Sequence, residues 1–283
     1  MGSCQIESSF FHCQLPTANF STPKSFPIIH RVIGAEKIDE RSKLSEISLG
    51  VVCPMANEEE SATAFVNAVL DECEGFRSVK FFAVLDRMSR DRTRELLYEL
   101  EGRRPELVVV WSPENSSVVD AYLRGYREAL RAGSDWILEI DAGFSHQPSD
   151  IPKFFYKMLE GYDCVFGSRF CEGGSIRESS AGREIISRGG TMLTNLLLGT
   201  RLKDMTGGFE MFTRGALYEI LKRGIRSRGP FFQTEIKAYC RRLRAAEVPI
   251  QYRAASHAVG GAAIRDSFSN LWRLFRLRLQ GQL

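Results

Sequence analysis

Long apolar runs are absent from this sequence. The longest candidate spans are interrupted by charged residues well before the ~20 apolar residues that a transmembrane helix needs. The start of the chain also lacks a basic region followed by an apolar run and a cleavage site, so no signal peptide is expected. We therefore predict a cytoplasmic protein, for which any membrane contact is peripheral.

Paired cysteines and an excess of one charge are missing as well. The seven cysteines are scattered, odd in number and without CxxC spacing, which argues against a disulfide framework or a zinc site and indicates reduced thiols. With 38 Lys and Arg against 35 Asp and Glu, the net charge is only +3. Such a small charge gives no reason to expect a nucleic-acid partner.

What is present is a hydrophobic content of 43% over 283 residues, enough for the core of one large domain. Residues 1–46 are sprinkled with Ser, Thr and Pro and lack sustained periodicity, so we expect a poorly ordered N-terminal extension. Residues 47–255 form the predicted domain, and residues 256–283 a basic amphipathic helix.

Within the predicted domain, strand patterns alternate with helix patterns. This alternation is typical of βαβ units and a parallel sheet, so we predict an α/β fold. The expected strands are Ile47–Cys53, Val79–Leu85, Leu107–Trp111, Trp136–Ile140 and Cys164–Phe166. The expected helices are Glu58–Cys73, Asp91–Glu101, Val118–Ala132, Ile151–Glu160, Ile185–Leu198, Phe232–Leu243 and Phe268–Leu279.

Three of these strands run into polar side chains. Asn57 and Glu58 follow the first strand, Asp86 follows the second, and Asp141 follows the strand that begins at Trp136. The carboxyl ends of parallel strands form the ligand crevice of an open α/β sheet, where an acid is costly to desolvate without a cation or ligand hydroxyl. A solvated turn, or a helix cap at Asn57, explains each end taken alone. Three such ends favour a shared pocket for a polar, metal-bridged ligand.

Six ordered segments between Ile47 and Tyr252 carry a more specific pattern. They are PMANEEE, LDRMSRDRT, EIDAGFSHQPSDIP, CVFGSRF, DMTGGFEMF, and FFQTEI with EVPIQY. Together they resemble the inverting glycosyltransferases of family 2, and within that family the dolichyl- or polyprenyl-phosphate mannosyltransferases. The resemblance implies the nucleotide-diphosphosugar transferase (GT-A) fold, with a Rossmann-like, mostly parallel sheet flanked by helices.

The resemblance also implies where the donor binds. Pro54, Asn57, Glu58 and Asp86 would form the nucleotide-sugar pocket, with the early carboxylates at base and ribose. Asp141 would be both a catalytic residue and the ligand of Mg²⁺ or Mn²⁺ at the diphosphate. A hard cation there neutralises the charge on the leaving nucleoside diphosphate.

Three arginines are implied to bind phosphate, because a guanidinium fork suits phosphate oxygens. Arg169 matches the family arginine after Gly-Ser and is a candidate for both catalysis and the acceptor phosphate. Arg183 and Arg188, on a segment similar to Arg-x-x-Ile-Ser, are candidates for the acceptor phosphate. A solvated helix face is the alternative interpretation of each arginine.

The implied reaction is a single displacement at the anomeric carbon with inversion. A phosphate acceptor is already an anionic nucleophile, whereas a hydroxyl acceptor needs a general base, for which Glu235 and Glu210 are the downstream acids. We place Glu235 among the catalytic candidates. Glu210 stands where the lipid-phosphate branch has arginine, and this reversal of charge argues against an anionic acceptor if the side chain faces the site.

The metal segment departs from the family pattern at Gly143, which replaces the second metal-side Asp. Asp141 is then the one certain metal carboxylate. Magnesium commonly uses only one or two carboxylates together with phosphates, so metal dependence is still expected. For His146 we expect satisfaction by the backbone of a turn rather than a ligand role.

The C-terminal helix places Phe268, Trp272 and Phe275 at helical spacing, with arginines between them. It lies either at an anionic membrane surface or on the domain with its arginines pointing outward.

The overall expectation is a hexosyltransferase, for mannose or glucose, that uses a nucleotide-diphosphate sugar and a polyprenyl phosphate at the cytoplasmic membrane face. Two alternatives stay open. One is transfer to a soluble, small-molecule hydroxyl acceptor in a glycoside or natural-product pathway. The other is a catalytically silent nucleotide-sugar-binding protein.

Overall fold

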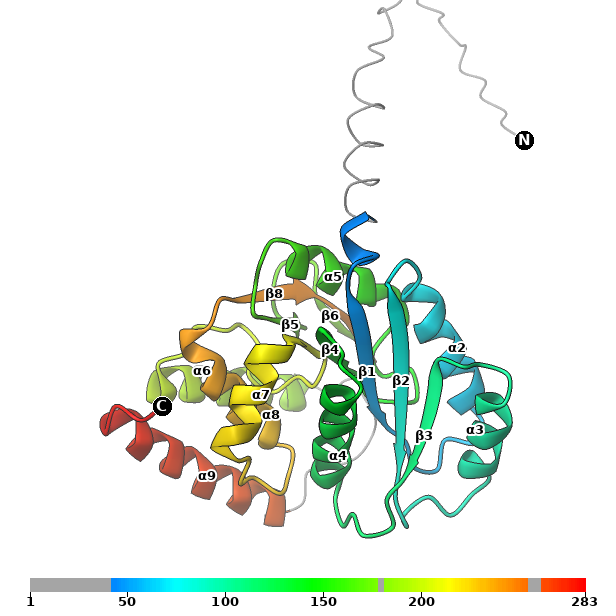
Figure 1. Ribbon diagram of the computed structural model, residues 1–283. Coiled ribbons are helices and arrows are strands. Elements are labelled where there is room, and N and C mark those ends of the chain that lie inside the picture. The colour runs from blue at the N-terminus through cyan, green and yellow to red at the C-terminus, as the bar shows by residue number, and fades with distance from the viewer. Residues whose placement is uncertain (1–41, 178–180, 254–260) are drawn as a thin grey trace, which may run out of the picture. The chain divides into compact units, whose positions relative to one another are not determined.

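A computed structural model describes residues 42–177, 181–253 and 261–283 (Figure 1). All of them belong to one compact unit, residues 38–283. The predicted N-terminal extension, residues 1–46, thus lies almost entirely outside the described residues.

The described unit is built on a twisted array of strands at its centre (Figure 1). The strands are β1 (Ser48–Pro54), β2 (Ser78–Leu85), β3 (Leu107–Trp111), β4 (Trp136–Glu139), β5 (Cys164–Ser168), β6 (Ser175–Arg177), β7 (Glu210–Thr213), β8 (Ala245–Pro249) and β9 (Gln251–Arg253). The main sheet has the order β3-β2-β1-β4-β7-β5-β8, and β6 pairs with β9 in a small parallel sheet. Only β7 runs antiparallel in the main sheet, between β4 and β5.

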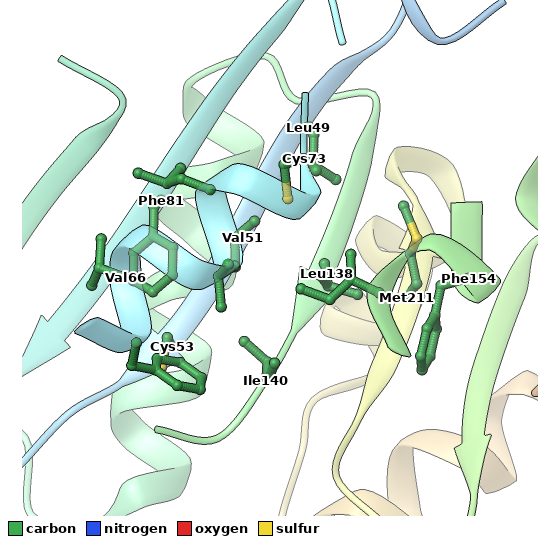
Figure 2. Packing of buried hydrophobic residues seen from close by; sticks show 14 of the residues in the cluster. Leu49, Val51, Cys53, Val66, Cys73, Phe81, Leu138, Ile140, Phe154 and Met211 are labelled. Carbon is green, nitrogen blue, oxygen red and sulfur yellow. The ribbon is translucent and has the colours of Figure 1, made fainter. Parts of the chain in front are cut away.

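Helices cover both faces of the main sheet. They are α2 (Ala62–Glu72), α3 (Thr93–Glu101), α4 (Val118–Arg131), α5 (Ile151–Leu159), α6 (Ala181–Leu198), α7 (Arg214–Arg223), α8 (Phe232–Tyr239) and α9 (Gly261–Leu279), with 3-10 turns at Pro148–Asp150 and Cys240–Arg242. Side chains alternate between faces along a strand. Val51 and Leu138 therefore join α2, α3 and α5 in one core (Figure 2), whereas Val52 and Ile137 join α4, α7 and α8 in the other.

The predicted α/β fold with a mostly parallel sheet is confirmed, and each expected strand and helix is present. Most ends are shifted by a few residues, but α9 begins at Gly261 instead of Phe268. Helix α2 begins at Ala62 instead of Glu58. The sequence pattern did not indicate α7 or the strands β6, β7, β8 and β9. A strand of four residues that pairs with β4 and β5, both far away in sequence, leaves little local signal.

The two last long helices, α6 and α9, pack against each other. Arg278 of α9 donates hydrogen bonds to the carbonyls of Leu196 and Leu197, each at 2.8 Å, and so caps the end of α6. Leu274 of α9 is fully buried. The expectation that a docked helix points its arginines outward is wrong for Arg278 and for Arg273, which bonds the buried Glu235. Among the described helices, none is both long and apolar enough to cross a bilayer.

Candidate functional site

Strands β2, β1 and β4 are consecutive and parallel in the sheet, so their carboxyl ends lie along one edge. Asp86 directly follows β2, Pro54 is the last residue of β1, and Asp141 comes two residues after the end of β4. The structure therefore brings together the three polar strand ends that the sequence singled out.

Asn57 links two of these strand ends. Its side-chain amide donates to the carbonyl of Met88 at 3.0 Å, and its Oδ1 accepts from the backbone N–H of Arg90 at 3.0 Å. Because Ser61 occupies the N-cap position of α2, the interpretation of Asn57 as a helix cap is wrong. Asp86 is buried and accepts from the backbone N–H of Met88 at 2.8 Å. The loops after β1 and β2 thus hold each other in place.

Asp141 is accessible at this edge, with a side chain that is 45% exposed, whereas Asp86 is buried. Its Oδ1 accepts a short hydrogen bond from the hydroxyl of Tyr122 on α4, a residue that the sequence did not indicate. Its Oδ2 lies 3.5 Å from Nδ1 of His146. Tyr122 thereby fixes one carboxylate oxygen and leaves the other directed toward the histidine side.

His146 is 2% exposed, and its ring packs against Phe209 and Tyr252 with centroids 5.0 Å and 5.2 Å away. Its Nδ1 has no hydrogen-bond partner among the described residues. The expectation that a turn satisfies this nitrogen is therefore wrong. Burial lowers the pKa of His146 below its usual value, so the ring is neutral at pH 7.

The loop after Asp141 turns back against Glu58. Gly143 and Phe144 have φ values of 76° and 59°, and the Phe144 ring packs edge-on against Phe65 of α2 at 5.1 Å. A Cβ placed on Gly143 would lie 3.0 Å and 3.1 Å from the two carboxylate oxygens of Glu58. The Glu58 carboxylate therefore fills the space of a side chain at position 143.

Arg169 follows β5 and forms an ion pair that the sequence did not indicate. Its Nε and Nη2 each donate to a carboxylate oxygen of Asp204 at 2.7 Å, and Nη2 also donates to Thr206 at 2.7 Å. Burial acts to raise the pKa of Asp204, but the hydrogen bonds and charge of Arg169 outweigh it and lower that pKa to about 2. The guanidinium is fixed in orientation; its catalytic and phosphate-binding roles stay predictions.

Arg188 of α6 lies on the same aromatic ring as Arg169. The guanidinium carbons of Arg188 and Arg169 are 4.3 Å and 5.1 Å from the centroid of Phe170. Beside them is a hollow of about 440 Å³. Its lining includes three cations and two apolar side chains, namely Arg188, Arg201, Lys203, Met192 and Leu202. Arg183 is also part of α6, but its side chain is outside those described.

Glu235 of α8 is fully buried and surrounded by donors. It accepts from the backbone N–H of Ser227 at 2.8 Å and from the hydroxyl of Tyr239 at 2.9 Å, and it forms a short ion pair with Arg273 of α9. These contacts tie α8 to α9. A catalytic role for Glu235 stays a prediction.

Glu210 of β7 is paired in register with Glu139 of β4, and both side chains are fully buried. The buried Lys237 of α8 lies 3.1 Å from Glu210. Burial raises the pKa of Glu210 to about 7 against the opposing charge of Lys237. Burial, aided by the charge of Glu210, raises the pKa of Glu139 well above its usual value. The charge reversal noticed at Glu210 is thus neutralised inside the protein by Lys237 and a retained proton.

This edge of the sheet suits a hard divalent cation. Asp141 and Glu58 offer carboxylate oxygens, and the unpartnered nitrogen of His146 lies beside Asp141. Mg²⁺ and Mn²⁺ favour such oxygen ligands together with phosphates. The described side chains contain no convergent group of three or more His, Cys, Asp and Glu residues that would enclose a metal. A cation here would take its remaining ligands from a bound diphosphate and water.

The family model described as glycosyl transferase family 2 matches residues 50–221. The chain belongs to glycosyl transferase family 2. Its polyprenol monophosphomannose synthase relative from Mycolicibacterium smegmatis is 29% identical over 223 residues, which cover 77% of this glycosyltransferase and 83% of the relative. The undecaprenyl-phosphate mannosyltransferase of Micrococcus luteus is 31% identical over 195 residues, with coverages of 67% and 80%. The resemblance carried by the six segments is confirmed.

Solved structures of glucosyl-3-phosphoglycerate synthase from Mycobacterium tuberculosis share the fold of this glycosyltransferase. The complex with UDP has a TM-score of 0.61 at 18% identity and covers 84% of this chain and 83% of that one. The complex with Mn²⁺, UDP and glucosyl-3-phosphoglycerate has a TM-score of 0.56 at 17% identity, with coverages of 93% and 86%. The predicted GT-A fold is confirmed.

Proposed function

We propose that this glycosyltransferase moves a hexose, in first place mannose, from a nucleotide-diphosphate sugar to a polyprenyl phosphate, with inversion and with Mg²⁺ or Mn²⁺ at Asp141. Two relatives support the acceptor and the sugar, because their names pair mannose with polyprenol or with undecaprenyl phosphate. The complexes of the structural neighbour with UDP and Mn²⁺ or Mg²⁺ support the donor class and the cation.

The observation that carries the acceptor proposal is the reversed polarity of α6. Its residues Ile186, Met192 and Leu196 are 75%, 73% and 74% exposed, whereas Thr191 and Thr194 are buried. A surface helix normally buries its apolar side and exposes its polar side. An apolar strip in water marks a contact with lipid or with a partner. A polyprenyl phosphate fits both features of this helix. Its phosphate suits the arginine, and its isoprenoid chain suits the exposed apolar side chains.

The described side chains fit a displacement without a general base. An oxygen of the acceptor phosphate, already ionised, bonds to the anomeric carbon, and the electron pair of the broken bond leaves with the nucleoside diphosphate. A bound divalent cation supplies the neutralisation of that leaving group. Asp141, held by Tyr122, would hold the cation, and Arg169 and Arg188 around Phe170 would bind the acceptor phosphate.

The same part of the molecule fits peripheral contact with a membrane. On α9, Phe268 and Trp272 are 62% and 60% exposed, and Arg265 and Arg276 are exposed on the same helix. Aromatic and basic side chains on a helix that lies in the interface plane bind anionic bilayers. We place this contact at the cytoplasmic face, where a lipid-linked acceptor meets a soluble donor.

Donor turnover tests the proposal. Released nucleoside diphosphate is measured with a panel of GDP- and UDP-sugars, with Mn²⁺ or Mg²⁺ and polyprenyl phosphate. Asp141→Ala should slow release by about 100-fold or more, because losing even an outer partner of a metal ligand costs roughly 10–100-fold. Asp71→Ala, at an exposed acid of α2, is the control. If no donor is turned over with either metal, the catalytically silent alternative holds.

A further inference from the structure

Gly143 leaves the proposed metal site without a carboxylate at position 143, and the carboxylate of Glu58 lies in that space. An aspartate at this position would add a carboxylate two residues from Asp141. Instead, the carboxylate of Glu58 lies at the place of the missing side chain, with its oxygens 3.0 Å and 3.1 Å from a Cβ built on Gly143. Position 143 therefore has room for either its own acid or that of Glu58, but not for both as they stand.

The local structure holds Glu58 in this place. Its Oε2 accepts from the hydroxyl of Ser61 at 2.5 Å, and its backbone N–H donates to Oγ1 of Thr93 at 2.7 Å. The loop after Asp141 is held against the Glu58 carboxylate. Its backbone is left-handed at Gly143 and Phe144, and the Phe144 ring packs on Phe65 of α2. Both carboxylate oxygens of Glu58 thus face the loop at Gly143, with Ser61 bonded to the nearer of them, Oε2.

A second, independent feature at the same place points to a ligand. The buried His146 directs an unpartnered Nδ1 at the free oxygen of Asp141, 3.5 Å away. A buried polar atom without a partner is costly. A cation bound to Asp141 would lie beside this nitrogen, and a neutral imidazole nitrogen can offer its lone pair to a metal. Burial raises the pKa of the Cys53 thiol on β1, and Asp141 and Glu58 both lie close enough for their charges to raise that pKa further.

We propose that Glu58 supplies the second carboxylate to the divalent cation beside Asp141, in place of the side chain that Gly143 lacks. This inference rests on the proposed function. It moves Glu58 from the base and ribose, where the family resemblance put it, to the diphosphate end of the donor. Two carboxylates, the diphosphate oxygens and water make a ligand set that Mg²⁺ and Mn²⁺ commonly accept.

Binding of Mn²⁺ itself tests the inference without any turnover. Free Mn²⁺ is titrated by electron paramagnetic resonance with the full chain, in the presence of UDP and, separately, of GDP. Glu58→Gln keeps the hydrogen bond to Ser61 possible but removes the charge, and should weaken Mn²⁺ binding by about 10–100-fold. Glu60→Gln, at an exposed acid two residues further on, should bind Mn²⁺ as the wild type does.

The double variant Glu58→Ala/Gly143→Asp returns the acid to position 143. Removing the Glu58 carboxylate opens the space, and aspartate tolerates left-handed φ better than most residues. This variant should recover most of the Mn²⁺ affinity that Glu58→Ala alone loses. Melting temperatures without metal establish that each variant is folded.

Three outcomes separate the inference from the proposed function. Weaker Mn²⁺ binding by Glu58→Gln, with recovery in the double variant, supports Glu58 as a ligand. Wild-type binding by Glu58→Gln while Asp141→Asn loses Mn²⁺ overturns the role of Glu58 and leaves the proposed function standing. If the wild type binds no Mn²⁺ with either nucleotide, the metal-dependent function itself is overturned.

Discussion

Glu210 carried the strongest objection to an anionic acceptor when only its residue type was known. Its buried position changes that conclusion, because Lys237 lies 3.1 Å away and Glu139 is its partner across the sheet. Like charges directly opposite in an antiparallel pair are destabilising. Two acids therefore share one lysine and retain a proton near neutral pH.

This arrangement predicts a stability that falls as pH rises. The pKa of Glu210 is raised from 4.5 to about 7 in the folded protein, so the folded state binds more protons than the unfolded state between these values. The contribution of Glu210 to the free energy of unfolding is then fully present below about pH 4.5 and is lost as pH rises toward 7. Glu210→Gln should remove most of this decline, on the order of 3 kcal/mol, in urea unfolding followed from pH 5 to pH 8.

The control for this measurement is Glu219→Gln, at a 63% exposed acid of α7. Its unfolding free energy should follow the wild-type pH profile. An unchanged decline in Glu210→Gln would show that Glu210 titrates normally and is charged at pH 7, which would restore the objection to a phosphate acceptor.

At the scale of elements, α6 is the helix whose polarity contradicts ordinary packing. Replacing Ile186, Met192 and Leu196 by serine removes the apolar strip without disturbing the core, since all three side chains are more than 70% exposed. Burial of one large apolar side chain is worth about 1.5–3 kcal/mol. The triple variant should therefore bind anionic vesicles at least tenfold more weakly in co-sedimentation.

Tyr156→Ser is the matched control, because Tyr156 is 46% exposed on α5, on the opposite side of the sheet. It should leave vesicle binding unchanged. Equal binding by the wild type and the triple variant would exclude α6 from any membrane contact.

The elements also show what the sequence could predict. The alternation of strand and helix patterns located the strands that precede Asn57, Asp86 and Asp141, because those strands are rich in apolar residues and bounded by turns. Partners distant in sequence left no local signal. The bond from Tyr122 to Asp141 and the pair of Arg169 with Asp204 arise from tertiary packing alone.

Some sequence interpretations failed for the same reason. Asn57 has a good residue type for a helix cap, but its amide bonds a loop about thirty residues further on, a tertiary choice that overrides local preference. From the sequence, Arg273 is expected to be solvated, but in the folded protein it pairs with the buried Glu235 of α8. The contact of Glu58 with Gly143 likewise joins two strand ends that only the sheet order brings together.

At the scale of the whole molecule, the proposed function assigns the donor to the sheet edge and the acceptor to the last helices. The ends of β2, β1 and β4 offer acids for a nucleotide diphosphate and its cation. Arg169 and Arg188 both pack on Phe170, and Arg188 belongs to α6, the helix that carries the apolar strip. We expect the polar donor to bind at the sheet and the lipid-linked acceptor to approach along α6.

The most direct test of this account is transfer of a radiolabelled sugar from its nucleotide donor to polyprenyl phosphate embedded in lipid vesicles, with Mn²⁺ or Mg²⁺. We expect the wild type to move label into a charged glycolipid while it releases nucleoside diphosphate, and Asp141→Ala to move none. Release of nucleoside diphosphate with the label in a water-soluble glycoside, and none in the lipid, would contradict the account and establish a hydroxyl acceptor.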